Sequence, residues 1–360
     1  MPKLDFSDAE HVERPVPEKP WRALAFAALG AAALLTAGYE VFWRAKGLEA
    51  GDFNNTPALW AEARHKATGD ATVLLGSSRI FFGTDLNVWE DIAGVRPVQL
   101  ALEGTSPRVF LKDLAEDEAF RGQVFVGVTV PLFFGTDGGL RADVLNYTRD
   151  ETLAQRADQA MTKFLERHLA FIDEQSRPKR QVAIWPFPLR EGMLSRFDPR
   201  KLSASGADRD THMWARVETD ERYREEAKAQ WVIGLQRFAP PPGPDGKPPQ
   251  MPDAAIDAVI AEVKANAEKI RARGGDVHFL RFPFEGAYTG AENGGFPRER
   301  FWDRLVKETD SVGVSWHDYP ALQGYALPEW SHLSASERTR YTRALVPIVY
   351  GEIEKKRAAR

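Results

Sequence analysis

The segment 71–80 constrains the fold of this chain more than any other. Its apolar and branched residues run from Val73 to Leu75 and stop abruptly at a glycine and two serines. Such a run is typical of a buried strand in a parallel sheet that ends in a tight turn. Ligands of open α/β sheets bind outside the carboxyl ends of the strands, so this turn is where we expect chemistry.

Ser78, which lies in this turn, is a candidate nucleophile. If the chain enters a helix after the turn, backbone N–H groups and a helix N-terminus lie close to the hydroxyl. Serine is also a preferred N-cap residue, so the Gly-Ser-Ser sequence is equally explained as a helix cap. Taken alone, the cap is the simpler interpretation, and only a distant partner would change it.

Residues 328–334 supply that candidate partner, with the sequence Pro-Glu-Trp-Ser-His-Leu-Ser. A serine nucleophile needs a base within hydrogen-bond reach and a third group that orients the base. Glu329 and His332 are close enough in sequence for one short turn to hold both. Ser334 and Glu337 fit a capping box, which predicts that the terminal helix begins just after His332 and runs toward residue 356.

A Gly-Ser-Ser sequence after a strand, with an acid-x-x-His segment before a final helix, resembles the SGNH (GDSL-like) hydrolase superfamily. The likeness is closest to membrane-anchored members that work beside membrane-bound O-acyltransferases, such as alginate O-acetylation proteins and the D-alanyl-teichoic-acid transfer protein. It spans residues 70–350 and is strongest at the two ends. The resemblance implies a three-layer α/β/α flavodoxin-like domain with a mostly parallel sheet, working without a cofactor.

The resemblance also implies a role for each candidate site residue. Ser78 would attack an acyl carbonyl, His332 would take and return the proton, and Glu329 would orient His332. The backbone N–H groups of Ser78 and Gly104 would form the oxyanion hole, where one donor is worth ~3 kcal/mol. Gly104 follows the strand expected at 96–102, and it is equally explained as a turn glycine with positive φ.

Two positions depart from the superfamily pattern. The superfamily places an asparagine after its third strand as a further oxyanion donor, but the strand expected here at 123–131 ends in Pro131. Thr129 and Arg79 are candidate replacements for that donor. The acid of the acid-x-x-His segment is Glu329, where aspartate is usual. These departures favour an alternative, a catalytically inactive SGNH-like domain that binds glycan or scaffolds a membrane acyltransferase.

Arg79 and Arg281 are the candidate substrate-binding residues. Arg281 alternates with apolar neighbours in the strand expected at 277–283, so it would reach the carboxyl end of the strand and bind an anionic or carbonyl oxygen. An arginine in this setting more often pairs with a surface acid, and that interpretation stays open. The rival acid–histidine pair is His317 and Asp318, which on a strand would point to opposite faces.

Several other chemistries are excluded by the sequence. The chain has no cysteine, which excludes disulfides, Cys-ligated zinc and a thiol nucleophile. A net charge of −4 provides no global footprint for nucleic acid. We find no dinucleotide fingerprint, Walker loop, His-Glu-x-x-His metal motif or Gly-x-Ser-x-Gly elbow. A glycosidase site built from two carboxylates stays open, because paired acids have no fixed spacing.

Residues 21–43 are predicted to form a transmembrane anchor. The central stretch 23–39 carries no charge, and at ~1.5 Å per residue the span is about long enough to cross a bilayer, with Trp21 and Trp43 at the interfaces. The span lacks the polar face of a core helix, and the preceding tail is long for a signal peptide. Cleavage stays the alternative, because residues 36–38 resemble a cleavage site.

The chain is divided into a disordered tail (1–20), the anchor (21–43), a connecting helix (44–69) and an SGNH-like domain (70–356). A Pro-rich loop near 239–252 interrupts that domain, since an amphipathic helix and another strand follow it. The lysines and arginines that flank the anchor do not decide its orientation. The resemblance implies a single pass through the cell inner membrane, with the domain in the periplasm or otherwise outside the cytoplasm.

The middle of the chain is predicted from periodicity. Residues 150–174 show helical periodicity, with one apolar face formed by Leu153, Ala157, Met161, Phe164, Leu165 and Leu169. Further elements are expected as a strand at 181–186, charged helices within 206–237, helices at 253–273 and 298–310, and a strand at 312–318.

The preferred function is an O-acyltransferase or esterase that acts on acyl esters of an envelope or secreted polysaccharide. Its expected partners are the acylated glycan, a membrane-bound O-acyltransferase and the membrane itself. Neither a metal nor nucleic acid is expected to bind. The identities of the acyl group and of the glycan are not encoded in any motif of the sequence.

Overall fold

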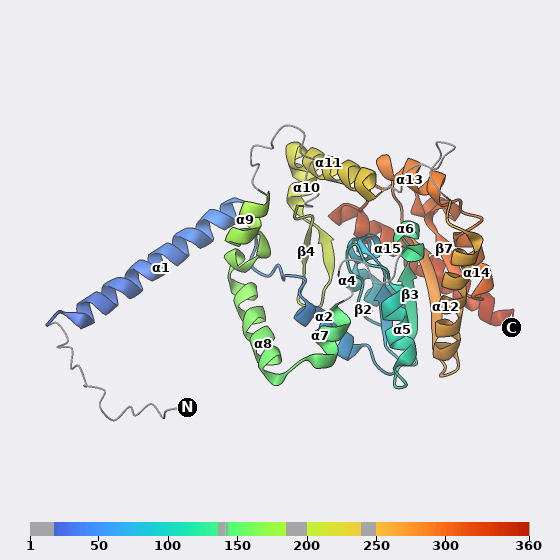
Figure 1. The fold of residues 1–360 in the computed structure, drawn as a ribbon, viewed down its shortest axis with the longest axis horizontal. Helices are drawn as coiled ribbons and strands as arrows, with labels where there is room; N and C mark the ends of the chain where they lie inside the picture. Colours follow the sequence, from blue (N-terminus) through green and yellow to red (C-terminus); the bar gives the residue numbers. More distant parts are fainter. Residues whose placement is uncertain (1–17, 136–140, 142, 185–199, 239–249, 360) are drawn as a thin grey trace, which may run out of the picture.

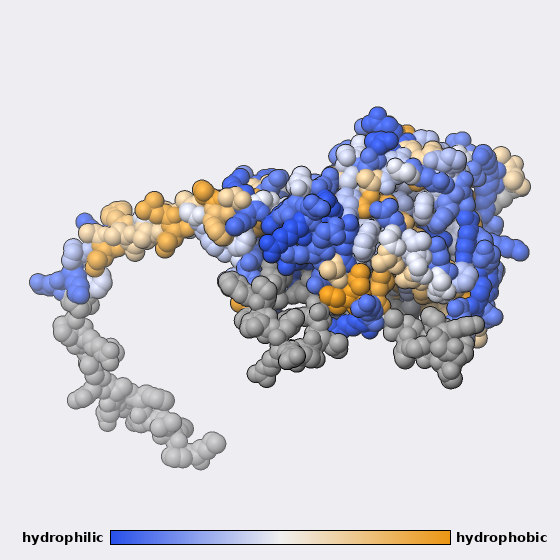
Figure 2. Space-filling model, turned by 90° about the horizontal axis from the view of Figure 1, so that it is seen from above, coloured by the Kyte–Doolittle hydropathy of each residue, from blue (hydrophilic) through white to orange (hydrophobic). Residues whose placement is uncertain are grey.

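The computed structural model describes residues 18–135, 141, 143–184, 200–238 and 250–359 (Figure 1). Most of the expected tail 1–20 and of the loop 239–252 lies outside these residues. Helix α1 (Trp21–Ala45) projects from the rest of the chain, and its apolar surface contrasts with the largely hydrophilic domain (Figure 2). The helix is long and apolar enough to cross a membrane, and none of its most apolar window is buried.

Five parallel strands form the central sheet, in the order β2-β1-β3-β6-β7. The strands are β1 (Thr72–Leu75), β2 (Val98–Gln99), β3 (Gln123–Gly127), β6 (Asp276–Arg281) and β7 (Val312–Ser315). The apolar runs that predicted β1 and β3 are almost fully buried, as expected for central parallel strands. The α/β class and the mostly parallel sheet are therefore confirmed.

Two apolar clusters pack against the sheet, because neighbouring strand residues point to opposite faces. Val73 and Leu75 belong to the cluster that contains α5 (Arg108–Glu116), α12 (Asp253–Arg271) and α14 (Trp302–Glu308). Leu74 belongs to the cluster that contains α3 (Ser78–Gly83), α4 (Leu86–Ala93) and α15 (Ala335–Ala358). Helix α15 begins after the cap Ser334, as predicted, and the Ser334 hydroxyl accepts from the N–H of Glu337.

The remaining elements surround this core. The helices are α2 (Pro57–Lys66), α6 (Val130–Phe134), α7 (Val144–Asp150), α8 (Leu153–His168), α9 (Pro178–Ile184), α10 (Ala215–Thr219), α11 (Glu221–Phe238) and α13 (Ala287–Gly295). Single 3-10 turns are η2 (Ala170–Ile172), η3 (Glu174–Ser176), η4 (Trp316–Asp318) and η5 (Pro320–Leu322). A separate antiparallel pair is formed by β4 (Ser203–Ser205) and β5 (Thr211–Met213).

Three local predictions were wrong. The segment 181–184 belongs to α9, because the proline that begins this helix suits the first helical position. Residues 316–318 form a 3-10 turn after β7. Residues 206–213 contribute a hairpin turn and β5, where a helix was expected; the turn is closed by Gly206 and by Arg209, whose φ is 66°. A positive φ at a non-glycine residue is set by tertiary contacts and leaves no pattern in the sequence.

Arg209 explains why this hairpin forms. Its guanidinium donates to the carbonyl oxygens of Gln99 (2.6 Å) and Ala101 (2.8 Å), which lie along the outer edge of the sheet. The side chain is fully buried, and burial lowers its pKa to about 9. Because an edge strand otherwise presents unpaired backbone groups, the hairpin covers an edge that would be free to pair with another chain.

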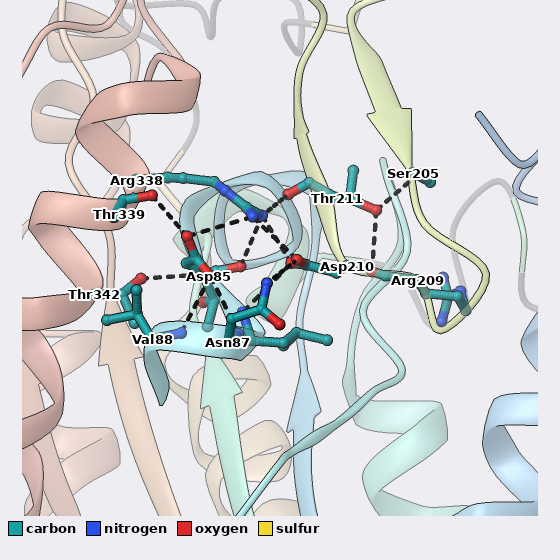
Figure 3. Close-up of polar contacts among 12 residues, drawn as sticks. Asp85, Asn87, Val88, Ser205, Arg209, Asp210, Thr211, Arg338, Thr339 and Thr342 are labelled. Atoms are coloured by element: carbon teal, nitrogen blue, oxygen red, sulfur yellow. Dashed lines mark hydrogen bonds and ion pairs between the residues drawn. The ribbon is translucent and has the colours of Figure 1, made fainter. Parts of the chain in front are cut away.

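Arg338 ties the terminal helix to the hairpin (Figure 3). It donates to Asp210 Oδ1 (2.8 Å) and to the Thr211 carbonyl (2.6 Å), and lies 3.5 Å from Asp85 Oδ2. Asp85 also caps α4 and accepts from Thr339 at 2.6 Å. A buried charge needs such partners to offset its lost hydration. The network therefore fixes the start of α15, directly after the segment that carries Glu329 and His332.

Candidate functional site

The turn between β1 and α3 requires glycine because three elements meet there. Gly76 has a φ of 151°, and a Cβ at this position would clash with the side chain of Ile80 in α3. A Cβ at Gly127, at the end of β3, would lie 2.5 Å from Ile80 Cγ2. Helix α3 therefore starts directly against the carboxyl ends of β1 and β3, which is where the sequence predicted the site.

The two serines of this turn have different surroundings. Ser77 is buried, and its Oγ lies 2.6 Å from Thr129 Oγ1. Ser78 is the first residue of α3 and is partly exposed. Within the described part of the chain no hydrogen-bond partner is found for its hydroxyl. Of the two hydroxyls, that of Ser78 is thus the one free to react.

Glu329 and His332 form a buried acid–histidine pair, and both side chains are almost fully excluded from solvent. Nδ1 of His332 lies 2.8 Å from Glu329 Oε1. Since an ionised carboxylate only accepts, this contact assigns the proton to Nδ1 and leaves Nε2 as the acceptor. Among the described residues Nε2 has no hydrogen-bond partner. Nε2 is therefore available to take a proton from a nucleophile.

Trp231 in α11 completes the surroundings of the carboxylate, because its Nε1–H donates to Glu329 Oε2. Burial raises the pKa of Glu329, but the charge of His332 and the hydrogen bonds from His332 and Trp231 outweigh it, so the net pKa is lowered. Glu329 is thus held as a carboxylate, the form that can orient and stabilise a protonated imidazole.

Helix α3 packs against the segment 329–333. Arg79, next to Ser78, donates from Nε to Ser331 Oγ at 3.4 Å. One turn further along the helix, the ring of Phe82 lies against the ring of His332, with centroids 4.4 Å apart. The structure therefore joins the two segments that the sequence predicted to meet. Ser78 Oγ and His332 Nε2 make no hydrogen bond with each other in this structure, so their contact during a reaction stays a prediction.

Gly104 follows the same sheet edge. The pairing of β1 with β2 continues beyond the strands, because Leu102 N–H donates to the Gly76 carbonyl at 3.0 Å. Gly104 comes two residues later with a φ of 64°. The positive φ fits the interpretation of Gly104 as a turn glycine. The position of this turn, beside the turn that carries Ser78, is also compatible with the interpretation as an oxyanion donor. Its oxyanion role stays a prediction.

The candidate replacements for the missing asparagine make internal contacts, and only Nη1 of Arg79 has no hydrogen-bond partner among the described residues. The Thr129 hydroxyl contacts Ser77, as described above. The Arg79 guanidinium lies 2.5 Å from Glu292 Oε1 and stacks over Phe284 and Tyr288, with Cζ at 4.6 Å and 5.2 Å from the ring centroids. Pro131 lies within α6 and has no N–H to donate.

Arg281 shares the same buried carboxylate. Its Nη2 lies 3.7 Å from Glu292 Oε2, and both side chains are almost fully buried. Burial lowers the pKa of Arg281; the charge of Glu292 opposes this effect and the charge of Arg79 adds to it. The acidic partner of Arg281 is thus the internal residue Glu292, and not an acid at the surface. Substrate binding by Arg79 and Arg281 stays a prediction.

The rival pair does not assemble. Asp318 accepts two hydrogen bonds from Arg298, at 2.5 Å and 2.8 Å. His317 stacks on Trp316 with ring centroids 3.9 Å apart. No group of three or more acidic or histidine side chains that could hold a metal ion occurs among the described residues.

Three contributors to the site were missed by sequence reasoning: Trp231 in α11, and Tyr288 and Glu292 in α13. Trp231 lies 98 positions from the carboxylate it contacts, within a segment whose charge indicated a solvated helix. Helix α13 was not predicted, because its sequence is rich in glycine and has no apolar period. No signal in the sequence could have identified these residues without knowledge of the fold.

The sequence was compared with known proteins. It matches no protein-family model. It also matches no curated protein. The likeness to the SGNH superfamily therefore rests on the sequence motifs alone and stays an expectation.

Proposed function

We propose that this chain is a membrane-anchored, SGNH-like O-acyltransferase or esterase that acts on acyl esters of an envelope or secreted polysaccharide. One observation carries the proposal. A buried Glu329–His332 pair, with an unpartnered Nε2, packs against the helix whose first residue is Ser78. Nucleophile, base and orienting acid thus come from segments in mutual contact, which is the arrangement that nucleophilic catalysis needs.

The chemistry follows from these roles. Nε2 of His332 takes the proton of the Ser78 hydroxyl as Oγ forms a bond to the acyl carbonyl carbon. The protonated imidazole, stabilised by Glu329, then returns the proton to the departing alcohol oxygen, and the acyl group stays on Ser78. A glycan hydroxyl or water next loses its proton to His332 and attacks the acyl-serine, and His332 returns this proton to Ser78 Oγ as the bond between Oγ and the acyl carbon breaks. The first acceptor gives transfer and the second gives hydrolysis.

The backbone N–H groups of Ser78 and Gly104 are proposed as the oxyanion hole. They follow neighbouring parallel strands, β1 and β2, which end at the same edge of the sheet. A donor directed at the developing negative charge is worth ~3 kcal/mol in such a site. The strand order also supports a three-layer flavodoxin-like domain, since this order is one of the two common doubly wound arrangements.

The proposed location is the cell inner membrane, crossed once, with the domain in the periplasm or otherwise outside the cytoplasm. Helix α1 supports the crossing by its length and apolar surface. A glycan ester and a membrane-bound O-acyltransferase are the proposed partners on that side. No role with nucleic acid is proposed, because the charges of the chain nearly balance.

The direct test is a fluorophosphonate probe, which modifies activated serines, applied to the full-length protein in detergent. Ser78→Ala should abolish labelling. Ser77→Ala is the matched control, because it removes a neighbouring hydroxyl that is already bonded to Thr129. It should keep labelling, at a cost of about 1 kcal/mol in the free energy of unfolding. Unlabelled wild type, or equal labelling of wild type and Ser78→Ala, would reject the proposed nucleophile.

A second candidate is a catalytically inactive SGNH-like domain that binds glycan or scaffolds a membrane acyltransferase. It is favoured by the missing donor at Pro131 and by the engagement of the Thr129 hydroxyl with Ser77, which leaves only the Nη1 of Arg79 unpartnered among the candidate donors of the described residues. The two candidates differ in cells. If the domain only binds or scaffolds, a Ser78→Ala strain with normal protein abundance should show wild-type glycan acylation. If the enzyme is an acyltransferase, this acylation should be lost; if it is an esterase, the acylation should rise above the wild-type level.

A further inference from the structure

Helix α8 presents its apolar face to the outside. Leu153, Met161 and Phe164 are 82%, 67% and 64% exposed, and Leu165 is also exposed. These residues recur at helical spacing and form the single apolar face that the sequence predicted for this segment. An amphipathic helix at the surface of a globular domain normally buries this face, so its orientation here is the reverse of the usual one.

The inward face of α8 is polar and is fixed by specific contacts. Glu166 is buried, and its Oε1 accepts from the side chain of Asn54 at 2.6 Å and from the backbone N–H of Asn54 at 3.2 Å. Lys163 Nζ lies 2.7 Å from Glu62 in α2. Turning the helix to bury its apolar face would break these contacts. The outward apolar face is therefore a built feature of the fold.

The turns η2 and η3, which directly follow α8, are joined to the end of α1. Glu40 in α1 accepts from the backbone N–H groups of Ala170 and Phe171, at 2.9 Å and 3.0 Å. Tyr39 Oη donates to the Ser176 carbonyl at 2.9 Å. Figure 1 shows α8 on the side of the domain from which α1 leaves, lying across the direction of α1. A bilayer crossed by α1 would therefore lie alongside α8.

We propose that α8 is an interfacial helix that lies on the same membrane that α1 crosses, with its apolar face among the acyl chains. Lipid is the occupant that the structure favours, because α8 runs directly into the turn that binds the end of the anchor. Tyr39, Phe42 and Trp43 gather at that end, where aromatic residues suit the headgroup level. An amphipathic helix with such a face binds in the plane of the interface. The inference rests on the proposed membrane anchoring.

Two attachments restrict the domain more than one does. A single helix leaves a domain free to turn about the helix axis, whereas a second helix held in the interface fixes which side faces the lipid. The ion pair between α8 and α2, together with the contacts of α1, transmits this constraint to the sheet. The carboxyl edge that carries Ser78 is thereby held in one orientation relative to the bilayer.

The test uses single cysteines, because the chain has none of its own. Full-length variants Met161→Cys, Leu34→Cys and Lys307→Cys are spin-labelled and reconstituted in vesicles of phosphatidylethanolamine and phosphatidylglycerol. Oxygen, which concentrates in lipid, and a water-soluble nickel complex then report the depth of each label. The ratio of oxygen contact to nickel contact should be highest for the label at residue 34 in α1. The ratio for the label at residue 161 should be severalfold higher than that for the label at residue 307, which should contact nickel.

The outcomes separate the inference from the anchoring on which it rests. If the label at residue 161 contacts nickel as much as the label at residue 307 does, while the label at residue 34 lies deep in lipid, the proposal of an interfacial helix is wrong. The anchor is then still supported. Nickel contact at residue 34 would remove the anchor and the inference together. Spin–spin broadening at residue 161 that disappears on dilution with unlabelled protein would assign the face to a second copy, which also overturns the proposal.

A charge-insertion pair gives an independent check. In Leu165→Cys protein, the double change Met161→Glu and Phe164→Glu should abolish most of the oxygen preference of the label. Ile92→Glu is the matched control, because Ile92 is an exposed apolar residue of α4. It should leave the preference unchanged, and both variants should unfold at the wild-type temperature. An unaltered preference in the folded double variant would contradict lipid contact.

Discussion

His332 donates twice to the same oxygen of Glu329. Its backbone N–H lies 2.7 Å from Oε1 and its ring Nδ1 lies 2.8 Å from Oε1. The first bond closes the turn between the two residues, and the second fixes the imidazole. One carboxylate therefore sets both the shape of the loop and the tautomer of the ring. A substitution of Glu329 should therefore change the position and the proton-accepting ability of Nε2.

We expect Glu329→Gln to reduce turnover of an activated acyl ester by about 10³-fold or more, as when the orienting acid of a triad is replaced by its amide. The substitution is nearly isosteric, but an amide has one acceptor oxygen, so it cannot serve His332 and Trp231 together. Steady-state hydrolysis of a nitrophenyl ester measures the effect. Turnover equal to that of the wild type would show that Glu329 does not orient a catalytic base.

Trp231→Phe is the companion variant to Glu329→Gln. It removes the donor to Oε2 and keeps both bonds from His332. We expect a much smaller loss of turnover than for Glu329→Gln, together with a destabilisation of about 1–2 kcal/mol from the lost hydrogen bond and ring. If the two variants lost turnover equally, the contact with Trp231, rather than the contact with His332, would determine the orientation of the Glu329 carboxylate.

Arg338→Met should lower the free energy of unfolding by about 3–5 kcal/mol, because it leaves the buried carboxylate of Asp85 and the partly buried carboxylate of Asp210 without their cation. Urea unfolding of the purified protein in mild detergent measures the difference. The matched control is Arg340→Met on the same helix. The partner of Arg340 is Glu337, which also lies on this helix, and the Arg340 side chain is 68% exposed. It should change stability by less than about 1 kcal/mol.

Stability should fall as the pH falls from about 6.5 to about 4, because of His278. Burial lowers the pKa of this residue to about 4 in the folded chain. In the unfolded chain the pKa is ~6.5, so the unfolded state binds more protons between these values, and the loss is on the order of 3 kcal/mol. Urea unfolding at several pH values should show a flatter profile for His278→Gln than for the wild type. An equal slope in the wild type and in His278→Gln would exclude His278 as the cause.

A reporter that is active only in the cytoplasm should stay silent when fused to the C-terminus of the chain. The reason is the proposed single crossing by α1, which would place the domain on the other side of the membrane. The same reporter fused before residue 1 is the control and should be active. Activity at the C-terminus would reject the proposed location and, with it, access to an external glycan.

The sequence predicted the elements whose signals are local. Continuous apolar runs identified β1 and β3, and the apolar residues next to Arg281 identified β6. The acid-x-x-His segment with its cap identified Glu329, His332 and the start of α15. Contacts made between distant segments could not be predicted, since nothing near Trp231 indicates that it bonds to Glu329. Periodicity found the apolar face of α8, but not that the face points outward, because that depends on the partners of Lys163 and Glu166.

The hydrogen bond from Arg79 to Ser331 spans 252 positions of the chain. Contacts of such long sequence separation are costly in loop-closure entropy and form late in folding. During synthesis of the chain, Ser78 is therefore made long before Glu329 and His332. On the proposed chemistry, the reactive serine is inert until the last helix has docked, so an incomplete or clipped chain cannot consume acyl groups in the cell.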